Sequence, residues 1–117
     1  MTIEAFRKAA LAMPGAVESA HMSHPDFRVR GKIFASLGYP DEEHGMLKLT
    51  LEQQSEFIER SPHAFESCKG AWGRGGATAV HLRSVTPAVL KAALEAAFHN
   101  IATGAVKQPR KAKGKRK

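Results

Sequence analysis

The stretch from His24 to Thr50 constrains the fold more than any other part of the chain. Its sequence, HPDFRVRGKIFASLGYPDEEHGMLKLT, alternates apolar and polar residues in three short runs separated by turn signals. Such alternation is typical of strands with one buried and one solvated face. The stretch therefore predicts a three-stranded antiparallel meander with strands at 26–30, 32–38 and 46–50.

The first turn of this meander is predicted at residues 30–31, because its glycine supplies the positive φ of a tight hairpin turn. That register pairs Val29 with Lys32 and Phe27 with Phe34. A turn one residue later would reverse the faces of one strand, and the sequence leaves both registers open.

Three further segments carry apolar residues at helical spacing, and each follows a threonine that can cap a helix. We expect helices at 3–13, 51–60 and 87–102, with N-caps at Thr2, Thr50 and Thr86. A fourth strand is predicted at 77–83, and connections are expected at 15–23 and 63–76. This order favours an α+β domain in which helices pack on one face of an antiparallel sheet of about four strands.

The positive charge of the chain is concentrated at its C-terminus. The 117 residues have a formal net charge of +7, but seven of the 18 Lys and Arg residues follow Val106, and no acidic residue does. The remaining cations equal the 11 Asp and Glu residues in number, so residues 1–106 are formally neutral. We therefore expect one domain at 1–104 and a disordered basic tail at 105–117.

Nothing in the chain requires an oxidising compartment or a membrane. The one cysteine, Cys68, has no intramolecular partner, and no apolar run reaches the roughly 18 residues that a membrane helix needs. Pro14-Gly15 interrupt the apolar run after Arg7-Lys8, which argues against a signal peptide. We expect a cytoplasmic protein without membrane insertion, with a monomer as the default state.

Several segments together resemble the MmcQ/YjbR family of small bacterial proteins. They are MPGAVES (13–19), HPDFRVRGKIFASL (24–37), MLKLTLEQQ (46–54), GAWGRGGATAVHL (70–82) and the closing helix through Ala97-Phe98. The resemblance covers residues 3–102 and implies a "double wing" fold like that of bacterial frataxin, together with DNA binding. It supplies no catalytic residues, and a shared fold does not fix a function.

Basic side chains in the predicted strands and in the glycine-rich segment KGAWGRGGA are candidates for phosphate contact, with an indole that can stack on a base. They are Arg28, Arg30, Lys32 and Lys48 in the strands, and Lys69, Trp72 and Arg74 in the segment. The alternative is that the strand cations pair with Asp26, Asp41 or Glu42, and that the tryptophan packs at the edge of the core.

The tail offers the plainest electrostatic signal. Its cations are Lys107, Arg110, Lys111, Lys113, Lys115, Arg116 and Lys117. If all of them engaged duplex DNA, the slope of log affinity against log salt would be about −6. The alternative is a tail that only keeps the protein soluble.

The sequence predicts no metal site, cofactor or catalytic centre. His21 and His24 lie in a predicted loop without a zinc motif, and the other four histidines, His44, His63, His81 and His99, are scattered over separate elements. The first helix offers only Glu4 beside two cations, so the acidic iron-binding ridge of frataxin does not transfer.

No phosphate-binding GK[ST] motif occurs in the sequence, and Cys68 has no base to activate it, although the neighbouring Lys69 would favour the thiolate. We therefore expect a non-enzymatic DNA-binding protein. The alternative is a small protein-interaction or ligand-binding domain with a merely solubilising tail.

Overall fold

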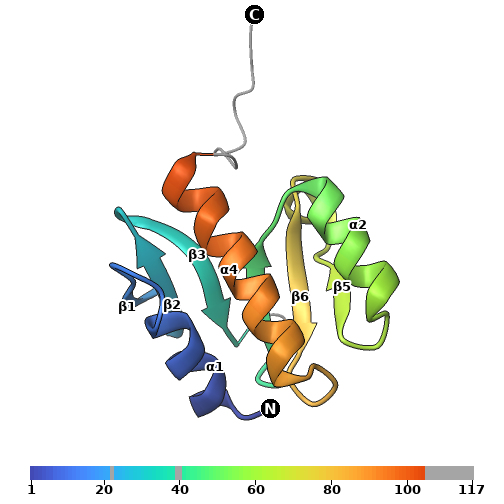
Figure 1. Ribbon diagram of the computed structural model, residues 1–117, viewed down its shortest axis with the longest axis horizontal. Coiled ribbons are helices and arrows are strands. Elements are labelled where there is room, and N and C mark those ends of the chain that lie inside the picture. The colour runs from blue at the N-terminus through green and yellow to red at the C-terminus, as the bar shows by residue number, and fades with distance from the viewer. Residues whose placement is uncertain (22, 39–40, 105–117) are drawn as a thin grey trace, which may run out of the picture.

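The computed structural model describes residues 1–21, 23–38 and 41–104. Its strands are β1 (Val17–His21), β2 (His24–Val29), β3 (Lys32–Leu37), β4 (His44–Lys48), β5 (Phe65–Ser67) and β6 (Ala77–His81). Its helices are α1 (Ile3–Leu11), α2 (Leu51–Arg60), α3 (Gly70–Arg74) and α4 (Pro87–Thr103). The strands form one antiparallel sheet in the order β1-β2-β3-β4-β6-β5 (Figure 1).

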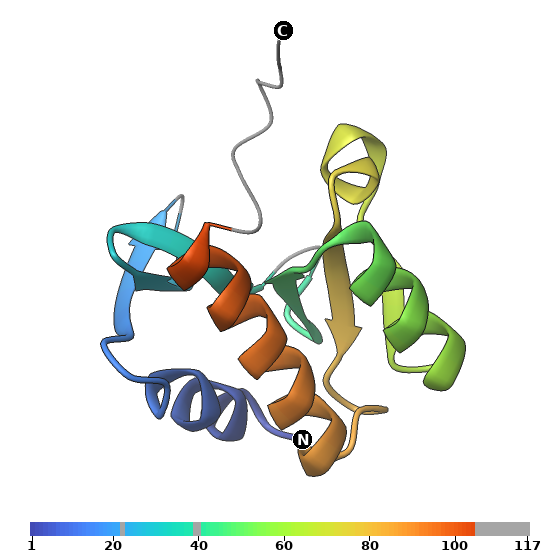
Figure 2. The same ribbon diagram turned by 45° about the horizontal axis from the view of Figure 1, so that its top comes forward.

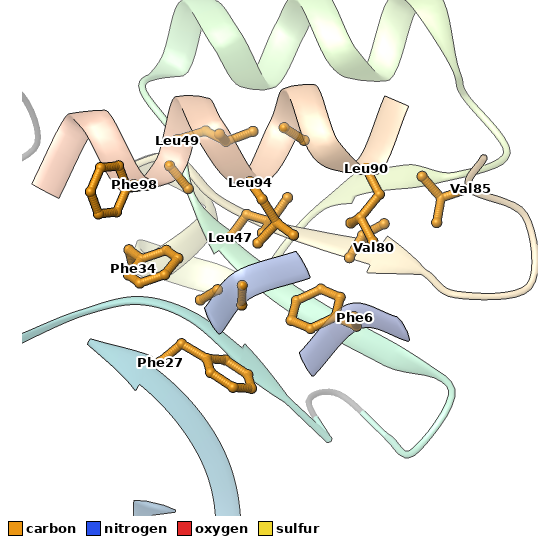
Figure 3. Close-up of a cluster of buried hydrophobic side chains, with 14 of the residues drawn as sticks. Phe6, Phe27, Phe34, Leu47, Leu49, Val80, Val85, Leu90, Leu94 and Phe98 are labelled. Carbon is orange, nitrogen blue, oxygen red and sulfur yellow. The ribbon is translucent and has the colours of Figure 1, made fainter. Parts of the chain in front are cut away.

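One face of the sheet is covered by α1, α2 and α4, and the hydrophobic core lies between these layers (Figure 1). Figure 3 shows Leu94 and Phe98 of α4 above Leu47 and Phe34 of the sheet. The rings of Phe34 and Phe98 meet edge to face with centroids 5.6 Å apart. Each fully buried Leu or Phe contributes about 1.5–3 kcal/mol, so this layer dominates the stability of the domain.

The α+β architecture is confirmed, but the sheet has six strands and not about four. The two additional strands, β1 and β5, form its edges, where the sequence predicted connections. Val17–Ala20 of β1 are all exposed, so this strand has no buried apolar face to produce alternation. The three residues of β5 are too few to show a period.

The hairpin turn lies where the sequence placed it. Arg30 and Gly31 have φ values of 56° and 80°, and Val29 pairs with Lys32, as predicted. The backbone twist of a turn with two such positive φ values matches the right-handed twist of the flanking strands.

The predicted pairing of Phe27 with Phe34 is wrong, because Phe27 pairs with Ala35. The register shifts between Phe27 and Arg28, so that Phe34 is the extra residue of a bulge. The bulge lets Phe27 and Phe34 both be buried completely in the core.

The predicted helix caps are confirmed. Thr2 Oγ1 accepts a hydrogen bond from Ala5 N, and Thr86 Oγ1 accepts one from Val89 N. Thr50 forms a reciprocal capping box with Gln53 at the start of α2. Among the residues that the structure describes, no helix combines the length and apolarity that crossing a membrane requires.

We call the side of the sheet away from α1, α2 and α4 its outer face. Along β4, Leu47 belongs to the core, so His44, Met46 and Lys48 alternate onto the outer face. The middle of this face is a small apolar patch of Met46, Cys68, Ala77 and Ala79. Polar side chains therefore gather at the two ends of β4.

Candidate nucleic-acid interface

The predicted contact residues in the domain come from the hairpin turn, the end of β4 and α3, which lie at one end of the molecule (Figure 1). Figure 2 shows the hairpin near the last turn of α4, with α3 apart from both of them. We call this region the cationic end and define it by Arg28, Arg30, Lys32, Lys48, Lys69, Trp72 and Arg74. Arg30 and Lys32 lie on the helix side of the sheet, because Arg30 bonds to α4 and Lys32 pairs with the core residue Val29, whereas Lys48 lies on the outer face.

Two of the hairpin cations are held by the protein itself. The Arg28 guanidinium donates Nε and Nη2 to the two carboxylate oxygens of Asp26, at 2.8 and 3.1 Å, and Asp26 is fully buried. These hydrogen bonds raise the pKa of Arg28. Arg30 Nη1 donates to the carbonyl oxygen of Ala102 at 3.1 Å, which complements the C-terminal dipole of α4. The alternative of pairing with Asp26 is thus confirmed for Arg28, while Lys32 is exposed.

At the end of β4, Lys48 and Trp72 contact each other. Lys48 Nζ lies 5.9 Å from the centroid of the Trp72 ring, within the range of a cation–π interaction. Burial lowers the pKa of Lys48. Trp72 keeps 46% of its surface exposed, so the indole is not a core side chain.

The glycine-rich segment, expected to be irregular, contains the helix α3. A Cβ at position 73 would lie 1.8 Å from the carbonyl oxygen of Cys68, so only glycine fits there. The Gln54 side chain on α2 donates to the carbonyl oxygens of Gly73 and Ala77, at 3.1 and 3.0 Å. These contacts fix α3 against the fold, with Lys69 and Arg74 exposed at its two ends.

Beside α3 lies an open hollow of about 570 Å³, lined by Leu51, Gln54, Ser67, Cys68, Gly70, Gly73 and Arg74. Burial, with a smaller contribution from Glu66 and against the opposing charge of Lys48, raises the pKa of the Cys68 thiol to about 11. The expectation that the thiol beside Lys69 has a depressed pKa is therefore wrong, because burial outweighs the nearby positive charge. A protonated thiol gives this hollow no nucleophile.

The predicted contact residues of the tail lie outside the described residues. They are Lys107, Arg110, Lys111, Lys113, Lys115, Arg116 and Lys117. The last described residue, Gly104, ends α4 in the left-handed conformation and lies at the cationic end. This end of α4 lies at the hairpin, where Arg30 bonds to Ala102.

The opposite end of β4 carries a cluster that the sequence analysis missed. His44 pairs directly with His81 of β6, and their ring centroids are 4.1 Å apart. His44 Nδ1 lies 2.6 Å from Asp41 Oδ1, and His81 Nε2 lies 2.7 Å from Glu66 Oε1. The bond to His44 lowers the pKa of Asp41. We call these four residues the histidine end; only the pairing of β4 with β6 reveals them.

Comparison with known proteins places most of the chain in one family. The family model described as YjbR matches residues 11–100. The crystal structure of Deinococcus radiodurans protein DR2400, described with the domain DUF419, is similar with a TM-score of 0.75 and 15% sequence identity. The match covers 92% of this chain and 83% of that chain, which supports the fold. No curated protein matches this sequence.

Proposed function

The chain belongs to the YjbR family, as its sequence resemblance predicted, and on this premise we propose that it is a non-enzymatic protein that binds DNA through its cationic end. The observation that carries the proposal is that the hairpin, the end of β4 and α3, which bear the predicted contact residues, all lie towards the end of the molecule at which α4 ends (Figure 1). A locally dense group of positive charges can bind a polyanion even where the domain as a whole is neutral.

The acidic residues support this reading by their position. Asp41, Glu42 and Glu43 lie in the connection that leads into β4, and Glu66 lies near His81. Four acidic groups thus lie at the end of β4 away from Lys48. Asp26, which bonds to Arg28, and Glu52, in the first turn of α2, are acidic residues on the side of the cations.

The cations of the interface take different roles in this proposal. Lys32, Lys69 and Arg74 are exposed and contact phosphates directly. Arg28 and Arg30 hold the hairpin in position through Asp26 and Ala102. The tail adds affinity that does not depend on the base sequence.

The test is binding of a labelled DNA duplex, measured by fluorescence anisotropy, to the full chain and to a chain that ends at Val106. We expect both to bind at roughly 50 mM salt, where phosphate contacts are least screened, and the full chain to show the steeper salt dependence. No binding by the full chain would refute the proposal. Binding by the full chain alone would assign the function to the tail and remove the domain from it.

The hollow beside α3 supports a second candidate, a domain that binds a small ligand. Its size suits a small molecule, and Gln54 and Arg74 supply polar groups to its wall. Screening small molecules by the rise in melting temperature tests it. A hit whose effect is lost in Arg74→Ala, with unchanged duplex binding by that variant, would favour the ligand over DNA.

A further inference from the structure

The histidine end brings together three side chains that can ligate a metal. His44 begins β4, His81 ends β6, and Glu66 belongs to β5, so three neighbouring strands each contribute one residue to the outer face. One ligand atom from each residue lies within 4.8 Å of the other two. Within residues 1–21, 23–38 and 41–104, this is the one such group of His, Cys, Asp or Glu side chains.

The spacing is close to what a metal site requires. Donor atoms about 2.0–2.1 Å from a tetrahedral zinc ion are about 3.4 Å apart, so separations within 4.8 Å must close by about 1.4 Å at most. The last torsion of a histidine or glutamate side chain has a broad energy minimum, so small rotations suffice. The ion would enter between His81 Nε2 and Glu66 Oε1, which now share a hydrogen bond.

Asp41 orients one of the ligands. Its Oδ1 contacts Nδ1 of His44, which leaves Nε2 of that ring for a metal. The same oxygen accepts a hydrogen bond from the backbone N–H of Glu43 at 2.8 Å, so the carboxylate is itself fixed. Metal-binding histidines usually have such a carboxylate behind the ring, which sets the tautomer and raises the basicity of the ligating nitrogen.

We propose that His44, Glu66 and His81 bind one divalent transition-metal ion of the zinc class, with Asp41 as the outer carboxylate that positions His44. Two imidazoles exclude magnesium and calcium, which prefer oxygen ligands. The side chains of His44, His81 and Glu66 are 12%, 34% and 59% exposed, so an ion can enter from solvent. Three protein ligands leave a fourth position for water. The proposal does not depend on DNA binding, and it replaces the sequence-based expectation of no metal site.

The experiment uses the full chain without a purification tag, because a histidine tag binds zinc itself. The protein is stripped with a chelator and titrated with Zn²⁺ alone in a calorimeter. We expect one saturable site per chain, with a rise in melting temperature on saturation. Co²⁺ in place of Zn²⁺ is expected to give the intense visible bands of a four-coordinate site.

Four variants assign the site to residues. His81→Gln and Glu66→Gln each remove a ligand and are expected to weaken zinc binding more than Asp41→Asn, for which we expect a loss of about 10–100-fold. His63→Gln is the matched control, because this histidine is exposed and lies outside the cluster. It should bind zinc as the unchanged chain does.

Circular dichroism establishes that each variant is folded. The proposal is overturned if the unchanged chain takes up no zinc saturably. It is equally overturned if folded His81→Gln binds zinc with unchanged affinity, or if His63→Gln abolishes the site.

Discussion

The two ends of β4 differ in how their polar groups are organised, although Lys48 and His44 both lie on the outer face. Lys48 and His44 are about 13 Å apart along the strand, at about 3.3 Å per residue. At the cationic end, charges from three elements are spread over the surface, and several are tied to local partners. At the histidine end, three ligand atoms converge within 4.8 Å.

This difference separates two kinds of recognition. Attraction to a polyanion sums over many charges and tolerates loose geometry, so a spread of lysines and arginines suffices. Coordination of an ion requires a few atoms at defined distances. We therefore expect substitutions at one end to leave the function of the other unchanged.

The largest effect is expected from reversing the exposed charges of the cationic end. The triple variant Lys32→Glu, Lys69→Glu, Arg74→Glu should lose at least about a hundredfold in affinity for duplex DNA at roughly 50 mM salt, because three phosphate contacts become repulsive. Anisotropy titration measures the loss. Zinc uptake should not change.

The control for this variant reverses three exposed cations elsewhere: Lys8→Glu, Arg83→Glu, Lys91→Glu. It changes the net charge by the same amount, so it corrects for the overall field of the protein. An equal loss of affinity in the two triple variants would contradict a localised interface.

A smaller effect is expected from Gly73→Ala. The added Cβ would meet the carbonyl oxygen of Cys68, so the backbone of α3 must move. We expect the free energy of unfolding to fall by about 1–3 kcal/mol in urea denaturation. Duplex affinity should fall with it, because Lys69 and Arg74 flank this helix. Ala71→Ser, an exposed change in the same helix, should do neither.

The sequence revealed what depends on local pattern. The bounds of α2, its cap at Thr50 and the turn at Arg30-Gly31 were all predictable, because capping, helical period and positive φ are written in neighbouring residues. The cations of the interface could also be named, because charge is visible without a fold.

What the sequence did not reveal depends on register and on edges. His44 and His81 are 37 positions apart, and only the antiparallel pairing of β4 with β6 makes them neighbours. The strand partner of Phe27 was missed because a bulge shifts the pairing register of β2 and β3 by one residue. β1 was missed because an exposed edge strand has no buried face to show a period.

Trp72→Ala tests whether the cationic end also binds bases. Loss of a stacked indole typically costs 1–3 kcal/mol per base, and we expect about 1 kcal/mol, or roughly fivefold, because Lys48 already contacts the ring. The measurement is the affinity for single-stranded DNA. Trp72→Phe should retain most of it. Equal affinities of the unchanged chain, Trp72→Ala and Trp72→Phe for single-stranded DNA would show that Trp72 takes no part in binding.

The smallest effects are expected at Cys68, because charged groups at both ends of β4 affect the pKa of its thiol. Because the pKa of this thiol is about 11, and not the ordinary 9.0, the rate of its alkylation by iodoacetamide should keep rising with pH above pH 9. The folded state holds this proton more tightly than the unfolded state, so the associated stability is complete below pH 9 and is lost as the pH rises towards 11.

Lys48→Met should move the pKa of Cys68 upward and Glu66→Gln should move it downward, because the lysine favours the thiolate and the carboxylate opposes it. Zinc bound at the histidine end should act as Glu66→Gln does, since it neutralises that carboxylate. A thiol that titrates at the ordinary value in the folded protein would contradict the burial on which this reading depends.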